Sequence, residues 1–111
     1  MATEPLDITA DGWEQEVTAS SLPVLVDFWS VHCPPCVRLA PTISALAADF
    51  AGRLKVTKLD IGTAENEELI VNFGIRGIPC LIIFKGGAEI ARQEGAKEKE
   101  ALRKWIEKAL T

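Results

Sequence analysis

Two cysteines three positions apart, Cys33 and Cys36, are the residues whose type and spacing most directly indicate chemistry in this chain. Pro34 and Pro35 stand between them. A deprotonated cysteine attacks a disulfide and forms a mixed disulfide, and a second thiol nearby can then attack that bond and release the product. The spacing of one helical turn therefore predicts thiol–disulfide exchange, with Cys33 attacking and Cys36 resolving.

The position of the pair in the chain supports this chemistry. Cys33 follows an apolar run, Val24–Trp29, and a helix is predicted to begin just after it. Sites in α/β proteins lie at the carboxyl ends of such strands, and a helix N-terminus offers free N–H groups and a positive dipole end. We therefore expect a lowered pKa for the Cys33 thiol. Pro34 and Pro35 suit a helix start, where a missing N–H costs least, and they restrict the loop.

Other uses of a cysteine pair stay open at this point. A structural zinc site needs four ligands, and only Cys80 and the single histidine, His32, remain to complete one. His32 is next to Cys33 in sequence, which disfavours a zinc site that uses both residues as ligands. A purely structural pair, and an iron–sulfur cluster shared with a second chain, are the remaining alternatives.

Composition limits the class of protein. The 111 residues predict a single domain over 1–111, and 48% apolar residues are enough for a core. A net charge of −4 without a basic cluster argues against nucleic-acid binding. No apolar run approaches the roughly 18–20 residues of a membrane span. The start, MATEPLD, has neither the basic flank nor the apolar centre of a secretory signal, and three cysteines do not form a secreted disulfide framework. A cytoplasmic location is therefore expected.

The first half of the chain must supply the strand and the helix that hold the cysteines. We expect a short strand at Leu6–Thr9, a helix capped by Thr9 or Asp11 through about Ala19, and a buried strand at Val24–Trp29. A long helix should then run to about Ala51, kinked at Pro41 and ended by Gly52. Its apolar face is formed by Leu39, Ile43, Leu46, Ala47 and Phe50.

The second half predicts the rest of an α/β fold. A strand at Leu54–Asp60 and a short helix at Thr63–Asn72 come first. Gly86-Gly87 joins two strands, Cys80–Lys85 and Ala88–Glu94, into an antiparallel hairpin that Gly95 closes. The last helix has one apolar face, with Leu102, Trp105, Ile106, Ala109 and Leu110. The order β-α-β-α-β-α-β-β-α predicts a central mixed five-stranded sheet with about four helices on its two faces.

Several short motifs together resemble the thioredoxin family over nearly the whole chain, from about Leu6 to Leu110. They are "VDFW" before the cysteines, Pro41 in the helix, "KLD" at Lys58–Asp60, "GIRGIP" at Gly74–Pro79, "FKGG" and Gly95. The resemblance implies the thioredoxin fold and a protein-disulfide reductase that cycles between a dithiol and a Cys33–Cys36 disulfide without a cofactor or metal. It also implies disulfide-containing client proteins, an electron donor of the thioredoxin-reductase type and a monomer.

The resemblance assigns roles to three residues near the cysteines. Asp27 matches the family's buried aspartate beneath the second cysteine, and an apolar strand should raise the pKa of a carboxyl there. A partly solvated aspartate at a strand end is the alternative. Lys58 matches the lysine near that aspartate, or is a solvated strand lysine. Trp29 matches the aromatic residue beside the site, or is a core residue.

The resemblance also implies a groove for the client. Pro79 matches the family's cis-proline facing the disulfide, and Gly77, Ile78 and Gly95 would form an apolar groove around it. Such a groove takes an extended segment by main-chain pairing. His32, Pro34 and Pro35 would border it.

The chain departs from the family's usual Trp-Cys-Gly-Pro-Cys-Lys around the exposed sulfur. His32, Pro34 and Val37 replace the tryptophan, the glycine and the lysine. His32 would add positive charge near the thiolate at low pH, or is a plain surface histidine. Cys80 follows Pro79, where threonine is common, and is either a small strand residue or a regulatory or resolving thiol. Two other functions stay open: a thiol oxidase or isomerase, and a non-catalytic binding module.

Overall fold

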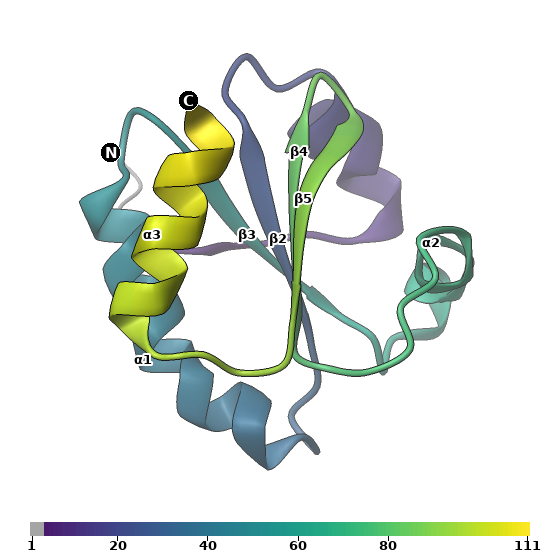
Figure 1. Ribbon diagram of the computed structural model, residues 1–111. Coiled ribbons are helices and arrows are strands. Elements are labelled where there is room, and N and C mark those ends of the chain that lie inside the picture. The colour runs from purple at the N-terminus through teal and green to yellow at the C-terminus, as the bar shows by residue number, and fades with distance from the viewer. Residues whose placement is uncertain (1–3) are drawn as a thin grey trace.

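A mixed β-sheet forms the centre of the computed structural model, which describes residues 4–111 (Figure 1). Over those residues the sheet has five strands in the order β1-β3-β2-β4-β5. β3 pairs parallel with both β1 and β2, while β4 pairs antiparallel with β2 and with β5. The strands are β1 (Leu6–Asp7), β2 (Val24–Trp29), β3 (Lys55–Asp60), β4 (Cys80–Lys85) and β5 (Ala88–Glu94). The predicted mixed sheet is confirmed, and β2, the strand that leads to the cysteines, lies at its centre.

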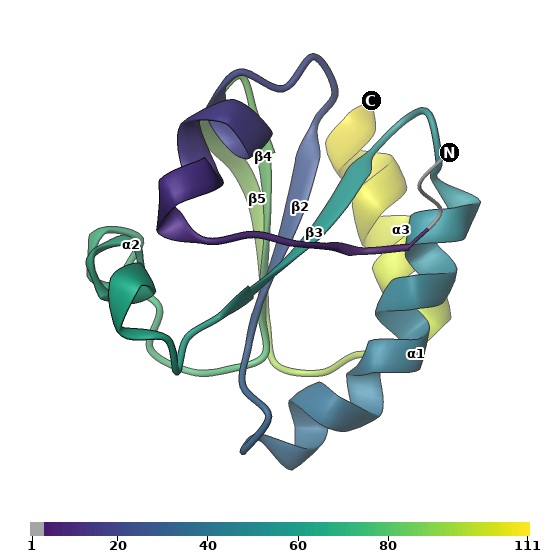
Figure 2. The ribbon, with the colours of Figure 1, turned by 180° about the vertical axis from the view of Figure 1, so that it is seen from behind.

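Helices cover both faces of the sheet, as predicted. Figures 1 and 2 show α1 and α3 on one side and α2 on the other. The helices are α1 (Pro34–Asp49), α2 (Glu67–Asn72) and α3 (Lys99–Leu110), with short helical segments η1 (Ala10–Gly12), η2 (Glu14–Thr18) and η3 (Ala64–Asn66). None of the described helices is long and apolar enough to cross a membrane.

The first helical region differs from the prediction. The expected regular helix through Ala19 is instead a 3₁₀ turn, η1, followed by a π-helical segment, η2. Thr9 precedes the turn in an extended conformation, but its side chain makes no capping hydrogen bond, and the backbone closes the turn. The ring of Trp13 packs against those of Phe73 and Phe84, with centroids 5.2 Å away in each case. This tertiary contact lies where one helix type changes to the other, so packing overrides the regular pattern.

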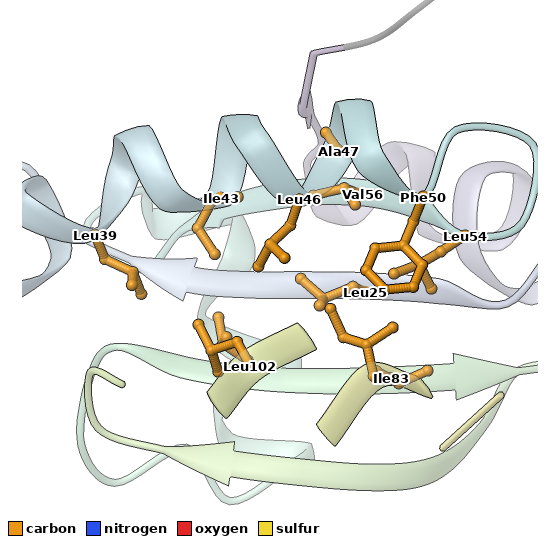
Figure 3. Packing of buried hydrophobic residues seen from close by; sticks show 12 residues of the cluster. Leu25, Leu39, Ile43, Leu46, Ala47, Phe50, Leu54, Val56, Ile83 and Leu102 are labelled. Carbon is orange, nitrogen blue, oxygen red and sulfur yellow. The ribbon is translucent and has the colours of Figure 1, made fainter. Parts of the chain in front are cut away.

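The larger core lies between the sheet and the pair α1 and α3. Figure 3 shows the apolar side chains of α1 pointing toward Leu25 of β2, with Ile83 and Leu102 closing the cluster from the side away from α1. The predicted apolar face of α1 is confirmed, since Leu39, Ile43, Leu46, Ala47 and Phe50 all belong to this cluster. α3 adds Leu102 and Ile106, against which Trp105, Ala109 and Leu110 pack.

The second core lies on the opposite face. Alternate residues of β2 and β4 point into it, among them Phe28, Cys80 and Phe84, and Trp13, Leu69 and Phe73 pack against them. Buried Asn66 joins the segments on this side, because its Oδ1 accepts from Ala10 N at 2.8 Å and its Nδ2 donates to Asp60 O at 2.9 Å. The sheet therefore separates two apolar layers.

Most element boundaries match the prediction to within two residues. Pro41 lies inside α1, which changes direction partway along its length in Figure 2. Gly52 follows α1 with a φ of +85°, the left-handed conformation that glycine adopts without strain. The strands β2, β4 and β5 have the predicted bounds. The predicted helix at Thr63–Asn72 is divided into η3 and α2.

Candidate active site

Cys33 lies between the end of β2 and the start of α1. Its N–H donates to Ser30 O at 3.1 Å, which shapes the connecting loop, and it caps α1 in an extended conformation. The N–H of Cys36 donates to Cys33 Sγ at 3.2 Å. The sulfur of Cys33 thus takes the place of a capping oxygen at the helix N-terminus. That placement favours negative charge on Cys33, because the N–H of Cys36 and the positive end of the helix dipole point at it.

Cys36 is turned into the protein, whereas Cys33 is only half-buried. The side chain of Cys36 is 2% exposed, and the two sulfurs form a disulfide across a Cα–Cα distance of 5.2 Å. Pro34 and Pro35 occupy the first two positions of α1, where a backbone N–H has no helical partner. The structure therefore shows the oxidised state of the pair, with its more accessible sulfur at the rim.

Asp27 is a buried carboxyl on the same face of the sheet as α1. It is 1% exposed, so it is not a partly solvated residue at a strand end, and its Oδ1 has no hydrogen-bond partner among the described residues. Burial raises the pKa of Asp27 to about 7, against an opposing effect of the positive charge on Lys58. A carboxyl with this pKa exchanges a proton readily near neutral pH.

Lys58 and Trp29 lie beside Asp27. Lys58 is directly across from Asp27 in the β2–β3 pair, and its Nζ lies 4.2 Å from the centre of the Trp29 ring. Both side chains are half-buried and line a hollow of about 340 Å³ together with Asp7 and Asp60. The structure thus places Trp29 next to Lys58, at a different hollow from the groove described next.

A groove of about 630 Å³ opens next to Cys33. The loop before β4 and the end of β5 form its lining, which consists of Gly74, Arg76, Gly77, Ile78, Arg92, Glu94 and Gly95. Cys33 Sγ lies 3.8 Å from Ile78 O. The Ile78–Pro79 bond is cis, and buried Pro79 accepts from Gly95 N at 2.9 Å. Gly77, Ile78 and Gly95 therefore line the groove, while Pro79 is buried and is hydrogen-bonded to Gly95 of the lining.

The remaining residues around Cys33 form an open rim. His32 and Pro34 are exposed, and Pro35 is half-buried. Val31 and Val37 are 58% and 49% exposed, which is unusual for valine and makes this rim partly apolar. A segment lying in the groove would contact this rim.

Cys80 belongs to a different part of the protein. Its side chain is buried in the core layer that lies on the other face of the sheet from α1. Burial raises the pKa of the Cys80 thiol. The sheet stands between this thiol and the Cys33–Cys36 pair. Within residues 4–111 no group of three His, Cys, Asp or Glu side chains could hold a metal ion.

Two residues that shape the site escaped the sequence analysis. Ser30 Oγ accepts from His32 N at 3.1 Å, a local turn for which a serine after a strand is a weak signal. Arg92 donates from its guanidinium to Phe73 O at 2.7 Å, which ties β5 to the loop that lines the groove. Nothing in the sequence shows this second contact, because it joins residues on separate elements.

A cysteine pair at a helix N-terminus, on the same side of the sheet as a buried carboxyl and beside a groove, defines a thiol–disulfide oxidoreductase. A sequence model of the thioredoxin family matches residues 4–108. Thioredoxin 1 of Nostoc sp. is 42% identical over 103 residues, which cover 93% of this chain and 94% of that protein. The thioredoxin of Pseudomonas aeruginosa is 38% identical over 107 residues, covering 96% and 97%. Chloroplastic thioredoxin M4 of Arabidopsis thaliana is 40% identical over 109 residues, covering 98% and 55%.

The chain belongs to the thioredoxin family. It is a thioredoxin-type protein-disulfide reductase with a redox-active dithiol, and its partners are disulfide-containing client proteins and a reductase that returns electrons to it.

Proposed function

We propose that Cys33 is the attacking thiol of this reductase and Cys36 the resolving one. The observation that carries the proposal is the difference between the two sulfurs: Cys33 is half-buried and receives an N–H at the helix start, and Cys36 is buried. An attacking sulfur must reach a client and be ionised, and a resolving sulfur needs only to reach its neighbour.

The reaction then runs in two exchanges. The Cys33 thiolate attacks one sulfur of a client disulfide, which forms a mixed disulfide and releases the first client thiolate. Cys36 loses its proton and attacks Cys33 Sγ, which forms the Cys33–Cys36 disulfide and releases the second client thiolate. The client gains two electrons, and the protein loses two. Two protons from the dithiol balance the two client thiolates.

Asp27 is the group that accepts the proton of Cys36 in this proposal. It lies on the α1 side of the sheet, and its pKa of about 7 matches a proton exchange near neutral pH. Lys58 supplies the positive charge that lets the carboxyl ionise in spite of burial. Oxidation and reduction of the dithiol thus need no cofactor or metal of the protein's own.

The client segment lies in the groove beside Cys33. Gly77, Ile78 and Gly95 line it and leave the backbone accessible for main-chain pairing, above Pro79. His32, Pro34 and Pro35 border the client at the rim, and Trp29 contacts it from the hollow that Trp29 shares with Lys58.

The setting of the protein completes the proposal. Residues 1–111 act as one domain and as a monomer, recharged by a donor of the thioredoxin-reductase type. The protein works in the cytoplasm, a reducing compartment that suits a chain of three cysteines built for redox exchange. It binds neither nucleic acid nor membranes.

Trapping experiments test the order of the two cysteines. Cys36→Ser should accumulate mixed disulfides with clients, because nothing resolves them, and Cys33→Ser should accumulate none. The measurement is non-reducing electrophoresis and mass spectrometry after incubation with an oxidised client. Cys80→Ser in a wild-type dithiol background is the control for the third cysteine. Mixed disulfides on Cys36 in the Cys33→Ser variant would reverse the assignment.

A further inference from the structure

The charged group of Lys58 faces an aromatic ring, although carboxylates stand nearby. Its Nζ lies 4.2 Å from the Trp29 ring centre, well inside the roughly 6 Å range of a cation–π contact. Among the described residues it makes no ion pair within 4.0 Å. Tryptophan is the most favourable ring for this contact. The ring therefore holds the ammonium group.

The alternative partners of Lys58 lie on the solvent side. Asp7 is directly across from Lys58 on β1, and Asp60 follows two residues later on the same face of β3. Both line the hollow that Lys58 and Trp29 share, and both are more exposed than Asp27. A lysine released from the ring would gain these solvated carboxylates without entering the buried region. The contact with Trp29 decides on which side the charge stays.

We propose that Trp29 is a positioning residue whose ring holds the Lys58 ammonium beside Asp27 and away from Asp7 and Asp60. The positioning itself is inferred from the contact between the ring and the ammonium group. Its effect on function rests on the proposed role of Asp27 in proton transfer. Trp29 thereby acts through Lys58 on the carboxyl, in addition to bordering the site.

The surroundings of Asp27 leave Lys58 as its dominant charged neighbour. From β3 it faces Lys58, and from β4 the uncharged Leu81 lies directly across from it. β4 also carries Cys80, a thiol whose pKa burial raises, so it is neutral near pH 7. α1 contributes the Cys33–Cys36 pair, which does not titrate when oxidised. Moving the ammonium therefore changes the main electrostatic influence on this carboxyl.

The test measures the pKa of Asp27 in oxidised protein, from the pH dependence of its side-chain carboxyl ¹³C signal. Trp29→Leu should raise this pKa by about 0.5–1, because the ammonium moves toward solvent and its attraction weakens with distance. Trp29→Phe, which keeps a ring of weaker attraction, should give a smaller rise. An unchanged or lower pKa in Trp29→Leu would overturn the proposal.

A second variant separates positioning from packing. Lys58→Met should raise the pKa of Asp27 at least as much, and adding Trp29→Leu to it should then cause no further change. Additive shifts in the double variant would mean that the ring acts on Asp27 independently of Lys58, and would also overturn the proposal. Trp105→Leu, on α3 against the larger core, is the matched control and should leave this pKa unchanged. The readout does not depend on turnover, so a failure of the proton-transfer role would appear separately, in the activity of Asp27→Asn.

Discussion

Asp27 makes the stability of the protein depend on pH. The folded protein holds the Asp27 proton up to a pKa of about 7, against an ordinary aspartate pKa of 3.8 in the unfolded chain. Between these two values unfolding releases a proton, so the free energy of unfolding falls as the pH rises. Below the lower value both states are protonated, and above the upper value both are ionised. The full penalty of the buried charge is therefore present above pH 7.

Asp27→Asn should remove this penalty and slow the reaction. Asparagine has the shape of the protonated carboxyl but does not ionise. We expect the free energy of unfolding of the variant to rise by roughly 2–4 kcal/mol relative to wild type as the pH increases from about 4 to about 8. Denaturant unfolding of the oxidised proteins measures this difference. Reduction of an insulin disulfide should slow at neutral pH, by at most about 10²–10⁴-fold. A stability difference that is constant with pH would contradict the buried-charge penalty. An unchanged rate would contradict the role of Asp27 in the reaction.

Cys80 should be chemically silent in the folded protein. Its side chain has 0% exposure, and its raised pKa keeps it protonated. In a Cys33→Ser/Cys36→Ser variant it is the one remaining thiol, so a thiol reagent reports on it alone. We expect labelling to be roughly 10²-fold or more slower than for a small free thiol, and complete at once in denaturant. Rapid labelling of native protein would instead favour a regulatory thiol.

At the scale of elements, Arg92 joins two parts of the groove proposed for the client. Its guanidinium makes two hydrogen bonds to Glu89, at 2.9 and 2.8 Å, and one to Phe73 O at 2.7 Å. Phe73 is the C-cap residue that follows α2, where carbonyls lack helical partners, and the loop that lines the groove follows at once. The planar fork of arginine serves these acceptors together, which the single point charge of lysine does not.

Arg92→Lys should therefore weaken client binding more than it weakens chemistry. We expect KM for a protein disulfide to rise about 3- to 10-fold with little change in kcat, as for loss of uniform binding. Amide exchange in residues 74–78 should accelerate in the same variant. Glu89→Gln is the matched control, because it removes the ion pair and keeps the Arg92 bond to Phe73. A change confined to kcat would argue against a role in forming the groove.

The regular elements were predictable because their signals are local. The apolar runs of β2 and β4, Gly86-Gly87 and the apolar face of α1 each determine one element without help from distant residues. The irregular segment at 10–18 was not predictable from local signals, because Trp13 packs against rings that lie 60 and 71 positions further along the chain. The same limit applies at the site. The cysteines and Asp27 stand in one short stretch, whereas the contact of Arg92 with Phe73 exists only in the folded chain.

At the scale of the whole molecule, the fold brings three connections to one end of the sheet. The loop from β2 to α1 carries Cys33, the loop before β4 carries the groove, and the turn after β5 closes it with Gly95. Figure 1 shows these three connections together at the lower end of the sheet. The first two loops are anchored by β2 and β4, central strands buried on both faces, so the sulfur and the groove keep a fixed relation. The fold therefore holds Cys33 in a fixed position beside the groove.

The direction of electron flow is a property of this whole arrangement, and it should favour reduction of clients. In a strong oxidant the attacking thiolate is heavily stabilised. This stabilises the reduced form of the pair and raises its reduction potential. Here the thiolate of Cys33 has the helix end and the N–H of Cys36, while Pro35 brings neither charge nor an N–H donor and His32 is exposed. These contributions are moderate. The pair should therefore stay in its reduced form less readily than that of an oxidase.

We expect a reduction potential of roughly −280 to −200 mV, at the reducing end of a scale on which a thioredoxin is itself the reference at about −270 mV. The prediction is thus that the chain stays near its family's value although Pro34 replaces the usual glycine. Equilibration with glutathione buffers, followed by acid quenching and thiol alkylation, measures it. Pro34→Gly is the matched variant and should move the potential by less than about 30 mV, which corresponds to about 1.4 kcal/mol. A potential above about −150 mV would show that the pair oxidises thiols in preference to reducing disulfides.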